Sequence, residues 1–256
     1  MMTECLTGLD DHALAERLAA RAGEWLLRLR ADFPEAGKPL GKAGDAGANE
    51  RLLQWLRQAR PDDGVLSEES PSDAARLSRR RVWIIDPLDG TREYGERALN
   101  RPDWAVHVAL AVDGLPVAAA VALPARGQTF GTASPMSPHR PPGGKLKILV
   151  SRSRAPEIAC QVAERLDAEL LPMGSAGAKA MAVLRGEAHA YLHDGGQYEW
   201  DSCAPVGVAR AAGLHASRLD GSACLYNQPD PYLPDLLICH PEWAEIFLTA
   251  IRAANA

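Results

Sequence analysis

The segment Arg81-Val82-Trp83-Ile84-Ile85-Asp86-Pro87-Leu88-Asp89-Gly90-Thr91 joins an apolar strand directly to two carboxylates. A proline and a glycine constrain the turn between the two aspartates and the residues after it. Such a turn directs Asp86, Asp89 and the carbonyl of Leu88 toward one location. Oxygen ligands of this kind suit Mg²⁺, which binds substrate phosphate alongside one or two carboxylates. The alternative interpretation is that both aspartates only cap a turn.

Two further acidic segments lie upstream and downstream of this turn. Glu68 and Glu69 follow a short apolar run, where one carboxylate can face a metal while its neighbour orients a ligand or water. Asp201 opens a strongly helical run that continues through Ala212. Taken singly, these residues are also explained as a solvated glutamate pair and a helix N-cap.

The hydrophobic pattern predicts two helices at the N-terminus and then a sheet. The first helix is capped by Asp10 and Asp11 and ends before Pro34, and the second runs from about Asp45 to Arg60 after a loop rich in glycine and lysine. Short apolar runs separated by glycine and proline turns then predict strands. They lie at residues 65–66, 82–85, 104–112, 117–123 and 128–133.

A segment rich in proline and glycine, residues 134–144, is the expected boundary between two halves. Beyond it the pattern alternates between strand and helix, at residues 146–150, 156–166, 169–173, 175–185, 188–193, 201–212, 235–239 and 243–253. We therefore predict a mixed, largely antiparallel sheet with helices in residues 1–140 and a smaller α/β half in residues 141–256.

Composition excludes several classes of function. A net charge of −5 and a pI of about 5.8 offer no general attraction to a polyanion, so we expect no nucleic-acid polymer as partner. The five cysteines are scattered and form no Cys-x-x-Cys pair, which favours reduced thiols packed mostly in the core. Neither a signal peptide nor a membrane span is recognisable, so we expect a cytoplasmic protein that does not bind membranes.

Together, the three acidic segments resemble the signature of the inositol monophosphatase superfamily in order and approximate spacing. The resemblance covers nearly the whole chain. Leu-Ser-Glu-Glu at residues 66–69 and Asp-Pro-Leu-Asp-Gly-Thr-Arg-Glu-Tyr at residues 86–94 are most similar to the bacterial 3′-phosphoadenosine 5′-phosphate phosphatases. Ser-Arg-Ser-Arg at residues 151–154 also resembles that branch. The resemblance implies a layered αβαβα sandwich and a phosphatase that uses two or three Mg²⁺ ions per site.

The resemblance also implies two groups of metal ligands. Glu68, Asp86 and the Leu88 carbonyl would hold one metal, and Asp86, Asp89 and Asp201 a second. Several carboxylates in one place would repel a phosphate dianion, so the site makes sense only when cations reverse its charge.

The catalytic residues implied by the resemblance are Glu69, Thr91 and Asp45. Glu69 would lie in the outer shell of the metals, and the backbone N–H groups of Gly90 and Thr91 would bind the phosphate. The Thr91 hydroxyl, paired with Asp45, would orient the attacking water. Many relatives have Thr-x-Ala-Asp here, whereas this chain reads Gly-Lys-Ala-Gly-Asp at residues 41–45, so a plain helix cap is the alternative for Asp45.

Substrate choice is expected to depend on the second half. A second basic region there predicts a substrate with two phosphates, and its members are Ser153, Arg154, Ser175, Lys179 and His193. We therefore predict hydrolysis of 3′-phosphoadenosine 5′-phosphate to AMP and phosphate. The alternatives are an inositol monophosphatase or fructose-1,6-bisphosphatase, and a catalytically silent nucleotide- or metal-binding protein. Relatives include monomers and homodimers, so both states stay open.

Overall fold

Strands β2 (Arg81–Asp89) and β3 (Ala105–Val112) form the centre of the first of two sheets in the computed structural model. The structure describes residues 6–71, 73–141 and 143–255. The strand order is β1-β2-β3-β4-β5, with β1 at Gly64–Ser67, β4 at Leu115–Leu123 and β5 at Gln128–Gly131. β1 pairs with β2 in parallel and the other pairs are antiparallel. The predicted mixed, largely antiparallel sheet is therefore confirmed.

Helices α1 (Asp11–Asp32) and α2 (Lys38–Ala59) cover one face of this sheet. Alternate residues of β2 belong to different hydrophobic cores. Trp83 and Ile85 pack toward α1 and α2, whereas Val82 and Ile84 pack toward the second half. Because both faces are covered, the strands read as continuous apolar runs. Asp10 caps α1 as expected, its side chain accepting a hydrogen bond of 2.8 Å from the Ala13 amide.

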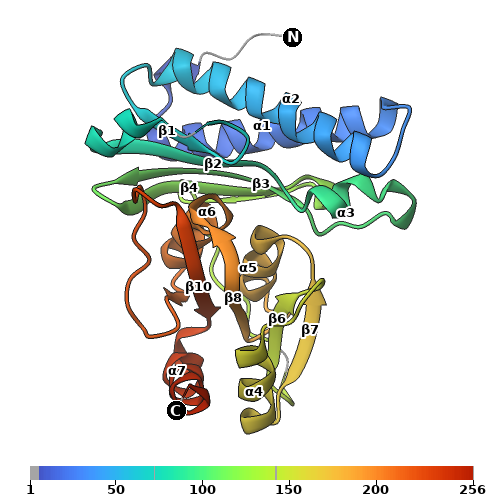
Figure 1. The fold of residues 1–256 in the computed structure, drawn as a ribbon, viewed down its shortest axis with the longest axis vertical. Coiled ribbons are helices and arrows are strands. Elements are labelled where there is room, and N and C mark those ends of the chain that lie inside the picture. The colour runs from blue at the N-terminus through green and yellow to red at the C-terminus, as the bar shows by residue number, and fades with distance from the viewer. Residues whose placement is uncertain (1–5, 72, 142, 256) are drawn as a thin grey trace.

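The second sheet has the order β7-β6-β8-β10-β9. Its strands are β6 (Lys147–Ser151), β7 (Glu169–Met173), β8 (Ala190–Tyr198), β9 (His215–Ser217) and β10 (Tyr232–Cys239). Helices α5 (Ala176–Leu184) and α6 (Glu199–Ala211) lie between the two sheets, and α4 (Glu157–Leu166) and α7 (Ala244–Ala254) cover the outer face, as Figure 1 shows. The predicted five-layer αβαβα sandwich is thus confirmed.

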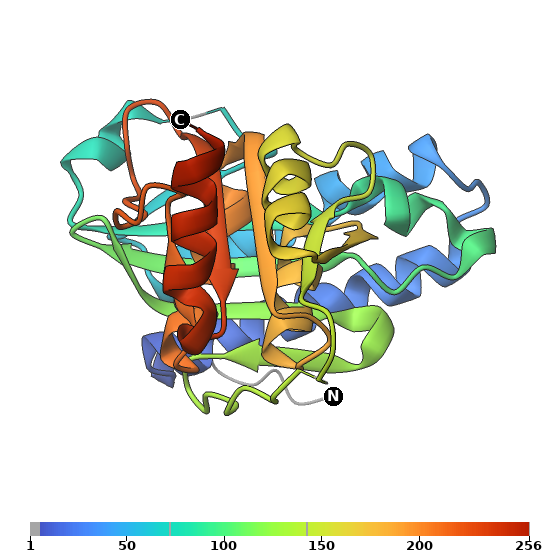
Figure 2. The same cartoon turned by 90° about the horizontal axis from the view of Figure 1, so that it is seen from below.

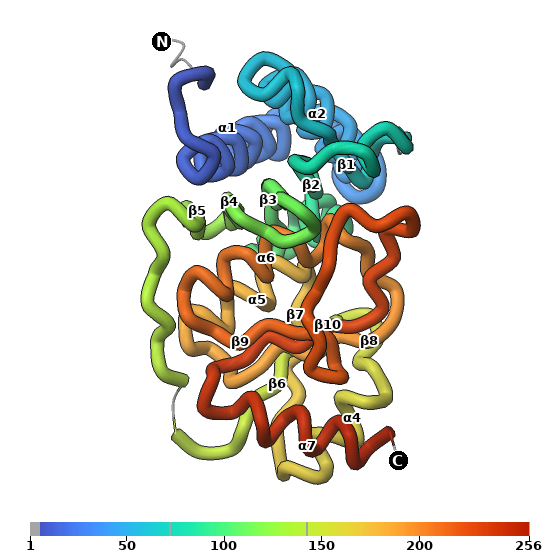
Figure 3. The backbone as a smooth tube through the Cα atoms, turned by 90° about the vertical axis from the view of Figure 1, so that its left-hand side faces the viewer, coloured from blue at the N-terminus to red at the C-terminus, as the bar shows by residue number. Residues whose placement is uncertain are grey.

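The two sheets cross rather than align. Figure 2, seen from the side of α4 and α7, shows the strands of the second sheet running across those of the first. The connection from β5 to β6 contains the predicted boundary at residues 134–144 and passes along one edge of the layers in Figure 3. No helix or strand occurs among its described residues, and Pro142 lies outside them. The division into two domains stays a prediction.

Short helices complete the fold. Helix α3 (Thr91–Gly95) follows the acidic turn, and short 3₁₀ helices occur at Leu6–Gly8, Ala74–Ser78, Arg97–Leu99, Pro124–Arg126 and Pro241–Trp243. Within the described ranges, no helix has both the length and the apolar character needed to cross a bilayer. Three cysteines are buried and free, Cys203, Cys224 and Cys239; Cys160 is exposed, and Cys5 lies outside the described residues.

The predicted start of the second helix was wrong. α2 begins at Lys38, so Asp45 lies inside the helix and does not cap it. The glycines that favoured a loop instead allow close packing: a Cβ at Gly41 would lie 2.7 Å from Thr91 Cγ2, and one at Gly44 would lie 2.8 Å from the Tyr94 ring. Their spacing of three residues, which places them near one helix face, was the signal for a helix.

Candidate metal and phosphate centre

The acidic turn leaves the sheet at the end of β2. Asp86 pairs with His107 of β3, the register then shifts, and Asp89 pairs with Ala105. The Leu88 amide donates to Asp86 Oδ1 at 3.0 Å, which closes the turn. Gly90 has a φ of 89°, and a Cβ there would lie 3.1 Å from the Asp103 carbonyl oxygen, so this position requires glycine.

Parallel pairing of β1 with β2 brings Glu68 beside Asp86. Ser67 pairs with Ile85, and the residues that follow these two are Glu68 and Asp86. Asn49 of α2 holds this end of β1, because it accepts a hydrogen bond of 2.7 Å from Ser67 Oγ. Asn49 also donates to Ser70 Oγ at 3.0 Å, across the turn that carries Glu69.

Asp201 reaches the same place from the second half. Tyr198 is the N-cap of α6, so Asp201 is the third residue of the helix. The alternative explanation of Asp201 as a helix N-cap was therefore wrong. Its side chain accepts a 2.8 Å hydrogen bond from the Tyr198 amide. Electrostatic repulsion links Asp201 to Glu68 and Asp89 and links Asp86 to Asp201. Four carboxylates that are far apart in sequence therefore converge.

Most carboxylates of the cluster have raised pKa values because they are desolvated and close to one another. Burial and then repulsion from Glu68 hold the pKa of Asp86 well above its usual range. Burial and then neighbouring carboxylates raise the pKa of Asp45 and of Asp201 to about 7. Glu68 keeps exposed surface, but desolvation by the surrounding protein and repulsion from Asp45 raise its pKa to about 7 as well. Neutralisation by a cation would relieve this repulsion.

Asp45 and Thr91 form the pair expected from the sequence. The Thr91 hydroxyl lies 2.9 Å from Asp45 Oδ2 and 3.1 Å from the Leu88 carbonyl oxygen. The other oxygen, Asp45 Oδ1, is buried and has no hydrogen-bond partner among the described residues. Glu69 is exposed, and its charge raises the pKa of Asp45. The pair therefore leaves one carboxylate oxygen for a water molecule.

Asp89 is anchored to the second half through one oxygen. Asp89 Oδ2 accepts a hydrogen bond of 2.5 Å from Ser175 Oγ and one of 2.8 Å from the Gly177 amide. Both donors lie at the start of α5, where Ser175 is the N-cap. Among the described residues no hydrogen bond uses Oδ1, so this oxygen is available to a cation.

His107 is the polar residue of this site that the sequence analysis missed. It is fully buried, and its Nε2 lies 3.2 Å from Asp89 Oδ2 while its Nδ1 lies 3.9 Å from Asp86 Oδ2. One ligand atom from each of the three side chains lies within 4.8 Å of the others. The available signal was a single polar residue inside the apolar run of residues 105–112.

The expected substrate-binding residues have different surroundings. Ser153 and Arg154 are exposed after β6. Lys179 is buried, donates to the Ser175 carbonyl at 2.7 Å and lies 5.0 Å from the centre of the Tyr191 ring. His193 of β8 is buried, and desolvation followed by the charge of Lys179 lowers its pKa to about 4. Ser175 directs its hydroxyl at Asp89, as described above.

Arg152, the other arginine of the same loop, is already engaged by the first half. Its guanidinium bridges Glu93, at 2.9 Å, and Asp103. The Gly174 amide also donates to Asp103 at 2.7 Å. These contacts tie the loops after β6 and β7 to the acidic turn, so Arg154 is the arginine of this loop that remains exposed.

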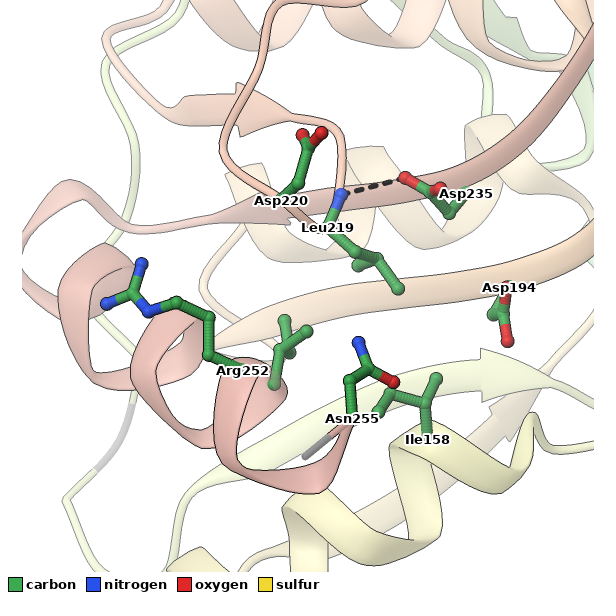
Figure 4. Close-up of a pocket in the computed structure, with 8 residues that line it drawn as sticks. Ile158, Asp194, Leu219, Asp220, Asp235, Arg252 and Asn255 are labelled. Carbon is green, nitrogen blue, oxygen red and sulfur yellow. Dashed lines mark hydrogen bonds between the residues drawn. The ribbon is translucent and has the colours of Figure 1, made fainter.

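A hollow of about 350 Å³ lies on the outer face of the second sheet, and Figure 4 shows its lining. Asp194 and Asp235 border it together with Ile158 of α4 and Ile251 of α7. Because successive strand residues point to opposite faces, Asp194 faces this hollow while the adjacent His193 faces the inner layer. The carboxylate next to His193 therefore lies on the side away from the acidic cluster.

The clustered residues fit divalent cations. They supply hard oxygen ligands, their mutual repulsion calls for positive charge, and Asp45 Oδ1 and Asp89 Oδ1 accept no hydrogen bond from the described residues. The residues that would hold the cations are Glu68, Asp86, Asp89 and Asp201 with the Leu88 carbonyl.

In a chelator, the free energy of unfolding is expected to fall by about 2 kcal/mol as the pH rises from about 6.5 to 8. The raised pKa values of Asp45, Glu68 and Asp201 mean that the folded state binds more protons, so this stability is complete at low pH and lost through about pH 7. His193 acts in the opposite sense below about pH 6.5, and Lys179, whose pKa is lowered to about 8 by burial, does so at the upper end of the window. Urea unfolding at each pH, with and without Mg²⁺, measures the effect.

Mg²⁺ is expected to remove most of this pH dependence, because bound cations keep the carboxylates ionised. A metal-free protein whose stability is constant across this window would show that burial and mutual repulsion do not raise the pKa values of these carboxylates.

Comparison with known proteins supports one family. The model of the inositol monophosphatase family matches residues 13–256. A 3′-phosphoadenosine 5′-phosphate phosphatase of Mycobacterium leprae is 51% identical, over 95% of this chain and 94% of that protein. The 3′(2′),5′-bisphosphate nucleotidase CysQ of Escherichia coli is 30% identical, over 75% of this chain and 81% of that protein.

Solved structures show the same fold at lower identity. CysQ from Bacteroides thetaiotaomicron, titled a bacterial member of the inositol monophosphatase family, superposes with a TM-score of 0.76 at 24% identity, over 89% of this chain and 96% of that one. The Thermotoga maritima IMPase TM1415 has a TM-score of 0.75 at 17% identity, over 96% of this chain and 98% of that one. With its fold, its acidic cluster and its sequence all in agreement, this chain belongs to the inositol monophosphatase family.

Proposed function

We propose that this protein is a Mg²⁺-dependent phosphatase that hydrolyses 3′-phosphoadenosine 5′-phosphate to AMP and phosphate. The observation that carries the proposal is the convergence of Glu68, Asp86, Asp89 and Asp201 next to the Thr91–Asp45 pair. The reaction would remove a by-product of sulfate activation and transfer, in the cytoplasm. We further propose that Li⁺ inhibits it by occupying a magnesium position.

The choice of substrate rests on relatives and on charge. The Mycobacterium leprae relative is named for this activity. Arg154 is exposed and its charge acts on His193, and the buried ammonium of Lys179 donates a hydrogen bond to the Ser175 carbonyl. His193, rather than a carboxylate, faces the same side. We propose that this basic region receives the second phosphate, which an inositol monophosphate lacks.

Metals bound by the four carboxylates would supply positive charge for the phosphate and lower the pKa of a bound water. The protein contributes the positions of the other groups. Neither the Gly90 nor the Thr91 amide donates a hydrogen bond within the described residues, and we propose that both bind phosphate oxygens. Because Gly90 needs a positive φ, another residue there would misplace both donors.

The attacking water would be held by Thr91 and Asp45. When the Thr91 hydroxyl donates to Asp45 Oδ2, its oxygen can accept one hydrogen bond from the water, and Asp45 Oδ1 can accept the other. The water then keeps a lone pair directed at phosphorus, and Asp45 is the group that takes its proton. Glu69, near Asp45, would orient further water around the metals.

Phosphate release from three substrates tests the function. With Mg²⁺, kcat/KM for 3′-phosphoadenosine 5′-phosphate is expected to exceed that for inositol 1-phosphate by about 10–100-fold, because the second phosphate adds charge-assisted hydrogen bonds of about 1.5–3 kcal/mol. Fructose 1,6-bisphosphate is the third substrate, and chelator should stop all turnover.

The controls separate the rival functions. Faster turnover of inositol 1-phosphate or of fructose 1,6-bisphosphate would contradict the substrate assignment but keep the phosphatase. Absence of turnover with all three, in protein shown to bind Mg²⁺, would favour a silent binding protein.

A further inference from the structure

His107 stands in β3 where the neighbouring positions are apolar. Its ring is fully buried, and the antiparallel register places it directly opposite Asp86. Burying a polar ring at a sheet centre costs free energy unless it has polar partners. Its partners are therefore the reason for its presence.

The ring is enclosed by three elements. A Cβ at Gly177 of α5 would lie 2.1 Å from His107 Nε2, so α5 approaches the ring as closely as a glycine permits. Nε2 lies 3.2 Å from Asp89 Oδ2 of β2, and Nδ1 lies 3.1 Å from the Trp200 carbonyl oxygen of α6. This enclosure leaves the ring little freedom to turn.

Both polar contacts of the ring are to segments that carry carboxylates of the cluster. A carbonyl oxygen only accepts, so the Trp200 contact is made by an Nδ1–H donor, and Nε2 attracts the Asp89 carboxylate as a second N–H donor when the ring is an imidazolium. Trp200 immediately precedes Asp201 in the first turn of α6. The imidazole thus spans the distance between Asp89, which leaves the first sheet, and the backbone that carries Asp201.

We propose that His107 is a positioning residue of the metal centre. Its Nε2 holds Asp89 Oδ2 and its Nδ1 holds the first turn of α6, so that Asp89 and Asp201 face the same cation. The inference rests on the proposed function, since it presumes that these carboxylates bind a metal. Partners that orient metal ligands typically contribute about 10–100-fold to metal affinity.

Three substitutions separate the two contacts. His107→Gln places an amide near the position of Nε2 and keeps a polar partner for Asp89, whereas His107→Asn places one near Nδ1 and keeps the contact with Trp200. His107→Leu removes both. Direct binding of Mn²⁺, followed by its electron paramagnetic resonance signal, and the KM for Mg²⁺ are compared with kcat at saturating Mg²⁺.

The Kd for Mn²⁺ is expected to rise about 10–100-fold in His107→Leu and less in His107→Gln, with kcat at saturating Mg²⁺ within about threefold of wild type. His240→Gln, at a buried histidine that contacts Val183, controls for the loss of a buried ring. Unchanged Mn²⁺ affinity in folded His107→Leu, or in both His107→Asn and His107→Gln, would overturn the inference. If wild-type protein itself failed to bind Mn²⁺, the proposed metal centre would fall, and this inference with it.

Discussion

Asp86→Asn is expected to abolish phosphate release and, at the same time, to stabilise the metal-free protein. Asp86 is the carboxylate assigned to both metals, so kcat/KM should fall by at least about a thousandfold, equivalent to about 4 kcal/mol. In chelator, at a pH above the raised pKa of Asp86, the sign reverses, because a neutral amide removes a buried charge from the repelling cluster. The free energy of unfolding should then rise by about 1–3 kcal/mol.

The substitution is conservative in shape. The asparagine side-chain oxygen can still accept the hydrogen bond from the Leu88 amide, so the turn keeps its closure. Phosphate release and urea unfolding in chelator measure the two effects. A fall in both activity and metal-free stability would indicate ordinary structural damage, and the repulsion argument would then be wrong.

Asp63→Asn is the matched control. Asp63 is a partly buried aspartate whose charge is compensated, because Arg81 binds both its oxygens, at 2.8 and 3.0 Å, and Trp83 Nε1 donates to it at 2.8 Å. Loss of this charge should lower the stability by about 1–3 kcal/mol and leave kcat near the wild-type value. The two aspartates therefore have opposite expected effects on stability.

Thr91→Val is expected to lower kcat by about 10²–10⁴-fold with little change in the affinity for Mn²⁺. Valine has nearly the shape of threonine but lacks the hydroxyl that lies 2.9 Å from Asp45 Oδ2. The water proposed to attack phosphorus would then lose one of its two acceptors. Single-turnover rates at saturating Mg²⁺ and substrate measure the loss.

Thr91→Ser keeps the hydroxyl and should recover most of the rate. Asp45→Asn should resemble Thr91→Val, because an amide cannot take the proton from the water. If Thr91→Val kept kcat within about threefold of wild type, the pair would serve only to pack α2 against α3.

The acidic turn shows what residues that are close together in the sequence can predict. Apolar residues 82–85 predict a strand, and Pro87 and Gly90 predict a turn that gathers its carboxylates, because these effects act within a few residues. The same reasoning failed for α2, where glycines were interpreted as loop residues. Their role is to allow the helix to approach Thr91 and Tyr94, which are distant in sequence.

His107 and Asp89 show the limits of such reasoning within the site. A histidine in an apolar strand indicates a buried polar contact, but only the register of β3 on β2 identifies Asp86 and Asp89 as its neighbours. The sequence analysis assigned Ser175 to a region that receives a substrate phosphate. In the structure the Ser175 hydroxyl and the Gly177 amide donate to the Asp89 carboxylate.

By itself the sequence determined the period of most elements, the order of the acidic segments and their resemblance to one family, because these depend on neighbouring residues and on motif identity. The tertiary structure alone decided which oxygens are engaged, which arginine remains exposed and that Asp201 joins Glu68, Asp86 and Asp89. Those outcomes depend on how two crossed sheets pack through α5 and α6, and no interval along the chain encodes that packing.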